Sequence, residues 1–279
     1  MKNLILFIVM VVSCFSTELN YAPKIKRPIE EKRFVVVIAS YNNEKFAQGN
    51  LESIYGQNYS NFRIIYTNDA SKDRTGEVVL DYVKNSKREI DFTYLENDTN
   101  KGAMYNYYTM VSSCENDEIV VIVDGDDRLF HKGVLKRLNQ AYADDHVWMT
   151  YGQDTSKMNP KGHSGPTPIV NLQDGSFRKL SYRWSHIRTY YAGLFKSIPK
   201  ENWMHEGKFY PMAQDIAQIC FLFDRACEHV YFMPDVLYDY NYVNPINEFR
   251  VDVQKQLHFA DIMYNKPRLE RFYSKSEFL

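Results

Sequence analysis

The fold is decided by the stretch IVVIVDGDD, residues 119–127, in which five apolar residues run directly into three carboxylates. A run of β-branched residues of this length is typical of a strand that is buried on both faces. Carboxylates at the end of such a strand repel one another and are poorly hydrated, so a cation is needed to stabilise their charged forms. Open α/β sheets bind their ligands at the carboxyl ends of strands. The stretch therefore predicts a cation-dependent ligand site at the end of a central strand.

Apolar runs and helical patterns alternate along the chain from residue 34 onward. Strands are expected at residues 34–39, 62–67, 92–95 and 119–123, and helices at residues 44–57, 74–86, 102–114 and 132–143. This alternation predicts an α/β fold with a mostly parallel sheet and helices on both faces. In the second half, residues 152–176 are rich in Gly, Pro, Asn and Asp and are expected to form a long loop. A helix is expected at 211–228, and a charged, partly helical tail at 248–279.

Four polar clusters fall at the carboxyl ends of the predicted strands. They are Ser40-Tyr41-Asn42-Asn43, Asn68-Asp69-Ala70-Ser71-Lys72-Asp73, Asn100-Lys101-Gly102 and Asp124-Gly125-Asp126-Asp127. In a doubly wound sheet these ends line one crevice. In this order and at these spacings, the clusters resemble those of the family 2 glycosyltransferases, which share the nucleotide-diphospho-sugar transferase (GT-A) fold. The resemblance is strong over residues 34–150 and weaker over residues 180–245.

The resemblance implies a nucleotide site built from the first three clusters and the start of the fourth. The implied contacts are Ser40, Tyr41, Asn42, Asp69, Lys101, Gly102, Asn106 and Asp124. The ring of Tyr41 would stack on the base, unless it fills the sheet edge. Asp69 would accept a hydrogen bond from a base N–H, unless it serves as a turn or cap residue before the next helix. Asn68 stands where the family usually has Asp, which leaves the identity of the base open.

The three carboxylates Asp124, Asp126 and Asp127 are the expected metal ligands. Hard oxygen ligands suit Mn²⁺ or Mg²⁺, and such ions also bind substrate phosphates. The resemblance implies Asp126 as the most direct ligand, with Asp124 nearer the ribose or the metal-bound waters. The ion would neutralise the diphosphate as it leaves the sugar carbon. A turn of solvated acids and a calcium loop are the alternative interpretations of the same residues.

Asp215 is the candidate general base. The family places this group in an acidic motif at the start of a helix in the second half, and in Gln214-Asp215 only Asp215 is a carboxylate. A positioned base contributes on the order of 10²–10⁴-fold to a reaction rate. The alternative is that Asp215 only stabilises the first turn of its helix, where negative charge is favoured.

His186 and Arg188 are candidate contacts to the acceptor or to phosphate. They alternate in the sequence, so on a strand they would share a face. A core histidine is the alternative for His186. Asn241 stands where relatives often carry a basic residue, so the cation expected near the diphosphate is missing or comes from elsewhere, with Arg188 as the replacement.

The implied activity is metal-dependent transfer of a sugar, with inversion, from a nucleotide-diphospho-sugar to an acceptor hydroxyl, as in a hexosyltransferase. A UDP-sugar is the favoured donor, and the acceptor is a glycan, a lipid or a protein. A non-catalytic nucleotide- or sugar-binding module is the main alternative, and the departures at Asn68 and Asn241 favour it. A sugar nucleotidyltransferase would need a Gly-rich basic loop after the first strand, where this chain has Ser40-Tyr41-Asn42-Asn43.

The composition and the N-terminus bound the cellular role. The net charge of −1 argues against a general nucleic-acid binder, which needs a basic face. Residues 1–16 resemble a secretory signal peptide or a short anchor, with Cys14 as a possible lipidation site, and residues 17–33 a polar linker. The GT-A domain would then cover 34–247, with a nucleotide-binding half up to residue 127. These features favour the lumen of the secretory pathway or membrane association, with the cytosolic face of a membrane as the alternative.

Overall fold

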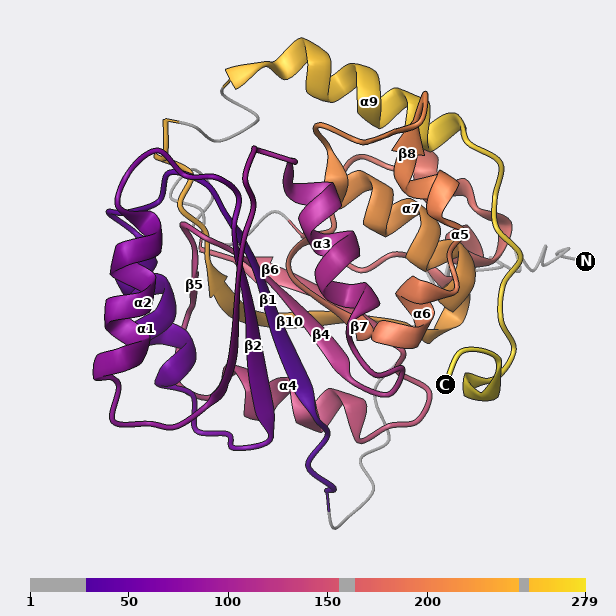
Figure 1. The fold of residues 1–279 in the computed structure, drawn as a ribbon. Helices are drawn as coiled ribbons and strands as arrows, with labels where there is room; N and C mark the ends of the chain where they lie inside the picture. The colour runs from indigo at the N-terminus through magenta and orange to yellow at the C-terminus, as the bar shows by residue number, and fades with distance from the viewer. Residues whose placement is uncertain (1–28, 156–163, 246–250) are drawn as a thin grey trace, which may run out of the picture.

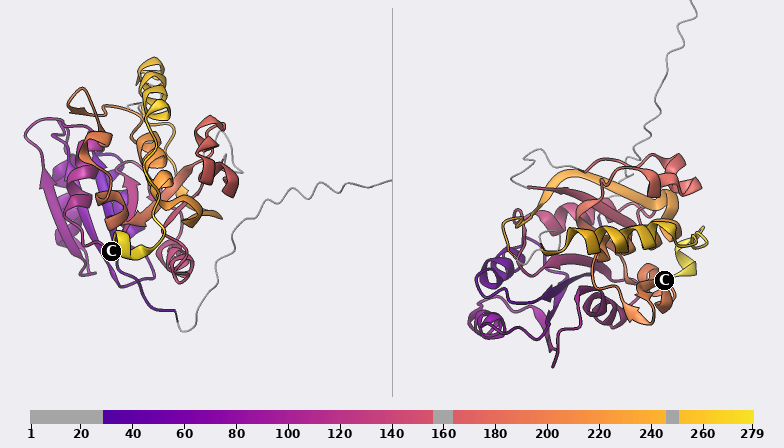
Figure 2. Two further views of the ribbon diagram at one scale, coloured as in Figure 1. Left: turned by 90° about the vertical axis from the view of Figure 1, so that its right-hand side faces the viewer. Right: turned by 90° about the horizontal axis from the view of Figure 1, so that it is seen from above.

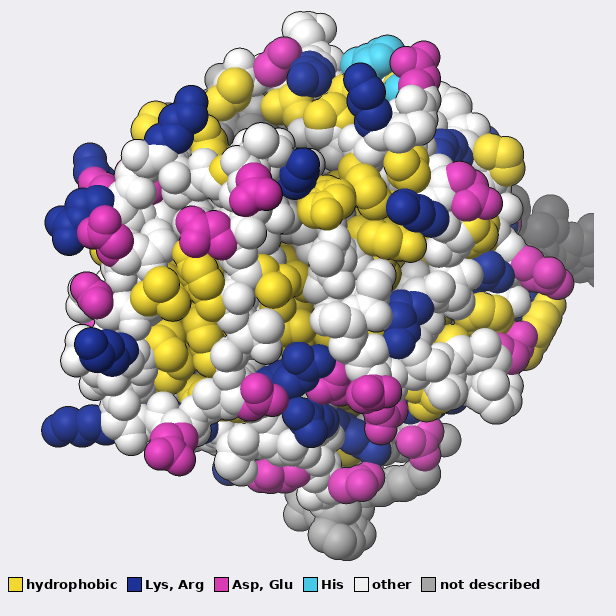
Figure 3. Space-filling view, viewed as in Figure 1, with side chains coloured by type: hydrophobic (Ala, Val, Ile, Leu, Met, Phe, Trp, Pro, Cys, Tyr) yellow, Lys and Arg dark blue, Asp and Glu magenta, His cyan; other side chains and the backbone are white. Residues whose placement is uncertain are grey.

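The computed structural model describes residues 29–155, 164–245 and 251–279. The expected N-terminal signal or anchor, and most of the linker, lie outside these ranges. Within them, no helix is long and apolar enough to cross a membrane. Acidic and basic side chains are interspersed over the face shown in Figure 3.

The described strands form one large curled sheet and a small hairpin. The sheet order is β3-β2-β1-β4-β7-β6-β10-β5. The strand bounds are β1 Phe34–Ser40, β2 Phe62–Asn68, β3 Asp91–Glu96, β4 Ile119–Asp124, β5 Arg128–Leu129, β6 Met149–Asp154, β7 Ser185–Tyr191, β8 Met204–His205, β9 Lys208–Phe209 and β10 Val230–Asp239. Strands β1 to β4 pair in parallel, and β10 pairs in parallel with β6. β7 is antiparallel to both of its neighbours, β4 and β6.

Helices flank the sheet on both faces, as the sequence predicts (Figure 1). The α-helices are α1 Ala47–Tyr55, α2 Thr75–Asn85, α3 Ala103–Ser112, α4 Val134–Tyr142, α5 Ile169–Asp174, α6 Ala192–Lys196, α7 Gln214–Ala226 and α9 Val253–Asn265. Short 3₁₀ turns lie at η1 Ser176–Lys179, η2 Lys200–Trp203, η3 Cys227–His229 and η4 Lys275–Glu277. The first four strands and helices fall within a few residues of their predicted positions.

The central strands β1 and β4 are buried on both faces, which confirms the prediction from IVVIV. Residues 119–123 are fully buried, and so are residues 34–38. The parallel register pairs Val36 with Val121 and Ala39 with Asp124. The first polar cluster and the acidic cluster therefore emerge side by side at the same edge of the sheet.

The second half departs from the sequence-based expectation at residues 152–176. The expected long loop is wrong in part, because β6 extends to Asp154 and α5 forms within the segment. The side chain of Leu172 is buried and anchors α5, and Gly175 ends the helix with φ +78°. One buried leucine is a weak periodic signal among so many Gly, Pro and Asn residues.

The C-terminal residues are integrated into the fold. The expected helical character is confirmed by α9, which packs along α7 and lies at the top of the molecule in Figure 1. The view from above in Figure 2 shows α9 running across the body of the domain. At the far end of the chain Phe278 is buried beside Trp148. This placement brings α9 to the same side of the molecule as α7.

Candidate active site

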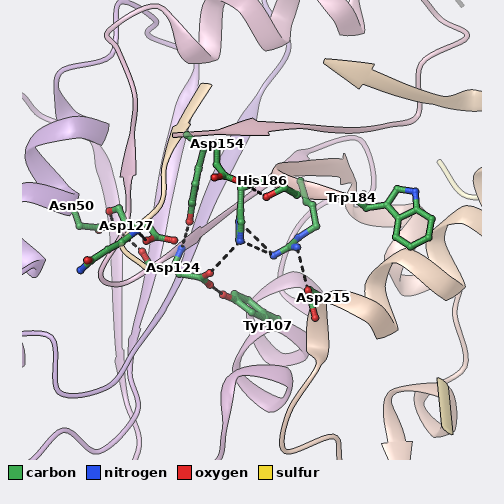
Figure 4. Close-up of polar contacts among 12 residues, drawn as sticks. Asn50, Tyr107, Asp124, Asp127, Asp154, Trp184, His186 and Asp215 are labelled. Carbon is green, nitrogen blue, oxygen red and sulfur yellow. Dashed lines mark hydrogen bonds and ion pairs between the residues drawn. The ribbon is translucent and has the colours of Figure 1, made fainter. Parts of the chain in front are cut away.

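A polar pocket of about 200 Å³ lies at the carboxyl ends of β1 and β4. Strand β7 and the starts of α3 and α7 complete it, together with α9. Its described lining residues are Ala39, Asn43, Ala103, Tyr107, Asp124, Asp126, His186, Arg188, Gln214, Asp215, Tyr240, Asn244 and Gln256. The structure thus brings the acidic cluster, His186, Arg188 and Asp215 together from segments that are far apart in the sequence (Figure 4).

Asn42 joins the loops that follow β1 and β2. Its backbone N–H donates to Ser71 Oγ at 2.9 Å, and its Oδ1 accepts from the backbone of Lys72 at 2.8 Å. Its φ of +53° lies in the left-handed region, which Asn tolerates better than most residues. Asn42 therefore braces the expected nucleotide site, and the half-buried Tyr41 precedes it.

Asp69 is buried and holds the loop that leads into α3. Its carboxylate accepts hydrogen bonds from the backbone N–H groups of Lys101 and Gly102, both at 2.8 Å, and from Asn97 Nδ2 at 2.7 Å. Asn97 also donates to Asn106, whose own Nδ2 has no partner in the described part of the chain. Both oxygens of Asp69 are thus engaged within the protein, while its contact to a base stays a prediction.

Gly102 and Gly125 are needed for different physical reasons. Gly102 has φ +83°, and an added Cβ would meet nothing within 4 Å, so the backbone conformation alone requires glycine. At Gly125 an added Cβ would lie 2.4 Å from Ser40 Oγ and 2.8 Å from Asn43 Nδ2. Glycine at position 125 therefore lets the acidic turn pack against the first polar cluster.

Asp124 lies at the end of β4 and is held on both sides by tyrosines. Tyr107 of α3 donates a short hydrogen bond to Asp124 Oδ1, and the backbone N–H of Asp124 donates to Tyr238 Oη at 2.9 Å. Burial raises the pKa of the Asp124 carboxyl, although Arg188 and Tyr107 oppose that shift. The position of this carboxylate is therefore fixed before any ligand arrives.

Asp127 is the most buried carboxylate of the cluster. One oxygen accepts from the backbone N–H of Asn241 at 2.6 Å, and Oδ2 has no hydrogen-bond partner among the described residues. Burial raises the pKa of Asp127 well above its usual range, Asp126 and Asp124 add to that shift, and hydrogen bonds from the backbone of Asn241 and from Tyr238 oppose it. A buried carboxylate oxygen without a partner is the group that a bound cation would satisfy.

Asp126 points to a different partner. Its Oδ2 accepts from Asn244 Nδ2 at 2.6 Å. Burial raises the pKa of Asp126 to about 6, and this hydrogen bond opposes the shift. The side chain lines the polar pocket and also a larger neighbouring cleft beside α1.

Asp124, Asp127 and His186 form the group that fits a metal ion. Each offers one ligand atom, and these atoms lie within 4.8 Å of one another. His186 Nε2 is 3.8 Å from Asp124 Oδ2, and its ring stacks on Tyr238 with centroids 4.4 Å apart. The carboxylates suit Mn²⁺ and Mg²⁺, whereas imidazole suits transition metals, so a site that includes His186 favours Mn²⁺ over Mg²⁺. The geometry adds His186 to the expected ligands Asp124 and Asp127, while Asp126 as the most direct ligand stays a prediction.

Arg188 carries the positive charge of the pocket. As predicted, it shares a face of β7 with His186, and its Nη2 lies 3.4 Å from the imidazole. Nε and Nη1 are buried without a hydrogen-bond partner among the described residues, and Nη1 is 3.9 Å from Asp215 Oδ2. Burial lowers the pKa of Arg188, but Tyr182, Asp215 and Asp124 outweigh it, so the net shift is upward. The guanidinium stays charged and has donors free for an anion.

Asp215 lies in the first turn of α7, at the border of the pocket. Its Oδ2 accepts from Tyr182 Oη at 2.9 Å, and its Oδ1 from the backbone of Ile216 at 2.8 Å. The preceding Ala213 has φ +57°, which is uncommon for a residue with a side chain. The carboxylate of Asp215 lies 3.9 Å from the guanidinium of Arg188.

Several residues of the site carry no signal that the sequence analysis used. They are Asn50, Tyr107, Tyr182, Tyr238, Asn244 and Gln256. Asn50 is the one with a readable pattern, because it is a polar residue on the buried face of α1, between Ala47 and Leu51. Its Nδ2 donates to the backbone carbonyls of Asp124 and Asp127 at 2.9 and 2.8 Å. Asn50 thereby holds both ends of the turn formed by residues 124–127.

Comparisons with known proteins bear on this site. A family model described as glycosyl transferase family 2 matches residues 35–199. A search of the curated proteins finds no match. The similar solved structures include complexes of three proteins, with UDP-GlcNAc, GDP-Man or UDP bound.

The first is S. aureus TarS, with 19% sequence identity and a TM-score of 0.56; the alignment covers 74% of this chain and 60% of the TarS chain. The second is the mannosyltransferase PcManGT from Pyrobaculum calidifontis, in complex with GDP-Man and Mn²⁺, with 17% identity, a TM-score of 0.63 and coverage of 90% and 70%. The third is glucosyl-3-phosphoglycerate synthase from Mycobacterium tuberculosis, in complex with Mn²⁺, UDP and phosphoglyceric acid, with 11% identity, a TM-score of 0.58 and coverage of 85% and 80%. At these identities the likeness concerns the fold, which is the GT-A fold expected from the sequence.

Proposed function

The chain belongs to glycosyl transferase family 2 and is a glycosyltransferase, and from this premise we propose that it transfers a sugar, with inversion, from a nucleotide-diphospho-sugar to an acceptor hydroxyl, using a divalent metal ion. A UDP-sugar is the proposed donor, and a glycan, lipid or protein the proposed acceptor. The observation that carries the proposal is the meeting of Asp124, Asp127 and His186 with Arg188 and Asp215 around one pocket.

The residues present fit a metal ion. The unpartnered Oδ2 of Asp127 and the raised pKa values of the acidic cluster both indicate a place that lacks positive charge. Asp124, Asp127 and His186 would hold Mn²⁺ or Mg²⁺, with Asp126 as a further expected ligand. When bound, such an ion supplies Lewis-acid stabilisation of a leaving diphosphate. Two of the similar solved structures contain Mn²⁺ with a nucleotide or nucleotide sugar.

Arg188 and Asp215 have separate proposed roles. The free N–H groups of Arg188 would donate to the diphosphate, because a charged donor in a buried site binds an anion strongly. Asp215 would take the proton of the acceptor hydroxyl while its oxygen forms a bond to the anomeric carbon. The bond from that carbon to the diphosphate breaks, and the electron pair leaves with the nucleotide. The adjacent hydroxyl of Tyr182 orients the Asp215 carboxylate for this transfer.

A non-catalytic nucleotide-binding module is the second candidate. It is favoured by the departures at Asn68 and Asn241, since each replaces a charged residue with an amide. The two candidates differ in turnover rather than in binding.

A donor screen tests the proposal. The full chain is incubated with UDP- and GDP-sugars in Mn²⁺, Mg²⁺ or EDTA, and release of free nucleotide diphosphate is measured. We expect hydrolysis of at least one donor, abolished by EDTA. Nucleotide binding by calorimetry without turnover would support the binding module instead. If Asp126→Asn and Asp215→Asn both kept full turnover, the assigned roles would be wrong.

We also propose that the N-terminal segment places the enzyme in the secretory lumen or on a membrane. The support is the apolar run from Leu4 to Val12, flanked by Lys2 and small residues. N-terminal sequencing and fractionation of the expressed protein test this, and a full-length N-terminus in a soluble fraction would contradict it.

A further inference from the structure

A second, mostly apolar pocket opens beside the polar one. It has a volume of about 510 Å³, within the range of small-molecule sites. Its described lining residues are Asp154, Leu180, Tyr182, Ser185, His186, Asp215, Ile216, Tyr240, Gln256, Leu257, Ala260 and Tyr264. Four of them, His186, Asp215, Tyr240 and Gln256, also line the polar pocket. The two pockets therefore meet at the carboxylate of Asp215.

Helix α9 forms one wall of this apolar pocket. Leu257, Ala260 and Tyr264 lie three and four residues apart, so they share one face of the helix. The side chain of Leu257 is 56% exposed, and an exposed large apolar side chain beside a pocket marks apolar surface available to a ligand. The other large apolar or aromatic lining residues include Leu180, Tyr182 and Ile216. An apolar group entering here would lose contact with water on several sides.

The boundary between the pockets carries two polar groups suited to a hydroxyl. Gln256 Oε1 is buried and has no hydrogen-bond partner among the described residues. Asp215 faces the same boundary. Among the described residues that line the apolar pocket there is no lysine or arginine, while Asp154 and Asp215 are carboxylates. A phosphate or carboxylate group inside the apolar pocket would therefore meet no cationic side chain among these lining residues, and the neighbouring Arg188 is the proposed partner of the donor diphosphate.

We propose that the acceptor is an uncharged alcohol attached to an apolar group, which occupies the α9 pocket while its hydroxyl lies between Gln256 and Asp215. This inference rests on the proposed glycosyltransferase function and names its acceptor class. In the transfer, the hydroxyl oxygen bonds to the anomeric carbon, its proton goes to Asp215, and the nucleotide diphosphate leaves with the electron pair. The apolar group determines affinity, and the two polar side chains fix the orientation.

Binding of simple glycosides tests the acceptor class without any donor. Octyl, phenyl and methyl β-D-glucosides, and glucose 6-phosphate, are titrated into the full chain by calorimetry, with octyl glucoside below its micelle concentration. Each buried methylene corresponds to roughly a threefold to fourfold gain in affinity, so burial of two gives about tenfold. We expect octyl glucoside to bind at least about tenfold more tightly than methyl glucoside, and glucose 6-phosphate to be the weakest ligand. A stronger gain for phenyl than for octyl glucoside would assign an aryl rather than an alkyl group.

Leu257→Glu and Leu80→Glu form a matched pair of variants. Both leucines are exposed on helices, and Leu80 of α2 is absent from the lining of the pocket. We expect Leu257→Glu to lower octyl glucoside affinity about tenfold, and Leu80→Glu to leave it unchanged. Equal binding of octyl and methyl glucosides, or an equal loss in both variants, would overturn the inference.

Donor hydrolysis without acceptor separates this inference from the function on which it rests. If hydrolysis occurs and the octyl preference is missing, the acceptor class is wrong and the glycosyltransferase function stands. If no donor is turned over, with octyl glucoside present or absent, but octyl glucoside binds in a Leu257-dependent way, the ligand class stands and the proposed transfer from these nucleotide sugars is refuted.

Discussion

Removing the charge of Asp126 is expected to stabilise the protein when no metal ion is present. The carboxyl has a pKa of about 6 against an ordinary value of 3.8. A difference of about 2 pKa units corresponds to about 3 kcal/mol. Asparagine has nearly the same shape and can still accept the hydrogen bond from Asn244, so Asp126→Asn removes the charge and little else.

The sign of the stability change with pH follows from how many protons the folded and the unfolded states bind. The folded-state pKa lies above the unfolded value, so the unfolded chain loses this proton first as the pH rises. The folded protein therefore loses stability from about pH 4 upward, and the full loss is reached above about pH 6. The asparagine variant does not titrate there. The free energy of unfolding of the variant should therefore exceed that of the wild type by about 3 kcal/mol at pH 8 and by about half that at pH 5.

Urea unfolding in EDTA at pH 5 and pH 8 measures this difference. Asp98→Asn is the matched control, because Asp98 is exposed and its carboxylate is hydrated in both states. Saturating Mn²⁺ should reduce the advantage of Asp126→Asn, since an ion that binds the folded wild type at 100 times its dissociation constant adds about 2.7 kcal/mol. A variant less stable than wild type at pH 8 in EDTA, or an advantage equal at both pH values, would refute the electrostatic reasoning.

Three further substitutions test other parts of the site. Asp215→Asn should lower the rate of sugar transfer about 10²–10⁴-fold, measured by steady-state kinetics, while calorimetry shows unchanged nucleotide affinity. A parallel loss of rate and affinity would mean that the role of Asp215 is structural. Arg188→Gln should weaken nucleotide diphosphate binding about 10- to 100-fold, because it removes charged donors, and unchanged affinity would exclude the proposed phosphate contact. Gly125→Ala should cost about 1–3 kcal/mol in urea unfolding through its clash with Ser40, and a neutral result would mean that the turn can shift.

The half of the site that follows the parallel strands could be predicted from the sequence. The burial of residues 119–123 fixes a central strand, and the parallel register with β1 places Ser40 beside the acidic cluster. β1 and β4 are not consecutive in the chain, so their pairing follows from the doubly wound strand order, in which the chain continues on the other side of its first strand. The different orientations of Asp126 and Asp127 within the acidic cluster could not be predicted from the sequence. Asp127 turns inward under Asn241 while Asp126 turns toward Asn244, and both partners lie more than 110 residues away.

The other half of the site depends on the antiparallel strand β7, which the alternation of strand and helix patterns in the sequence does not predict. β7 enters between β4 and β6, and continuing its register past Val121 and Thr189 brings His186 beside Asp124. The alternation of His186 and Arg188 predicts a shared face but not the sheet position. The contribution of Gln256 had no sequence signal at all, because α9 reaches the pocket only by packing on α7.

The charges of the site explain why a metal ion and the donor should bind together. Among the described residues around the pocket are the carboxylates of Asp124, Asp126, Asp127 and Asp215, against one guanidinium, that of Arg188. A diphosphate that entered alone would add negative charge to a place where burial already raises carboxyl pKa values. A divalent ion would offset two of the three excess negative charges, so it should raise the affinity for the donor. By linkage the donor must raise the affinity for the ion by the same factor. Arg188 lies on a buried strand and carries its charge in either state, which leaves the ion as the variable that controls donor binding.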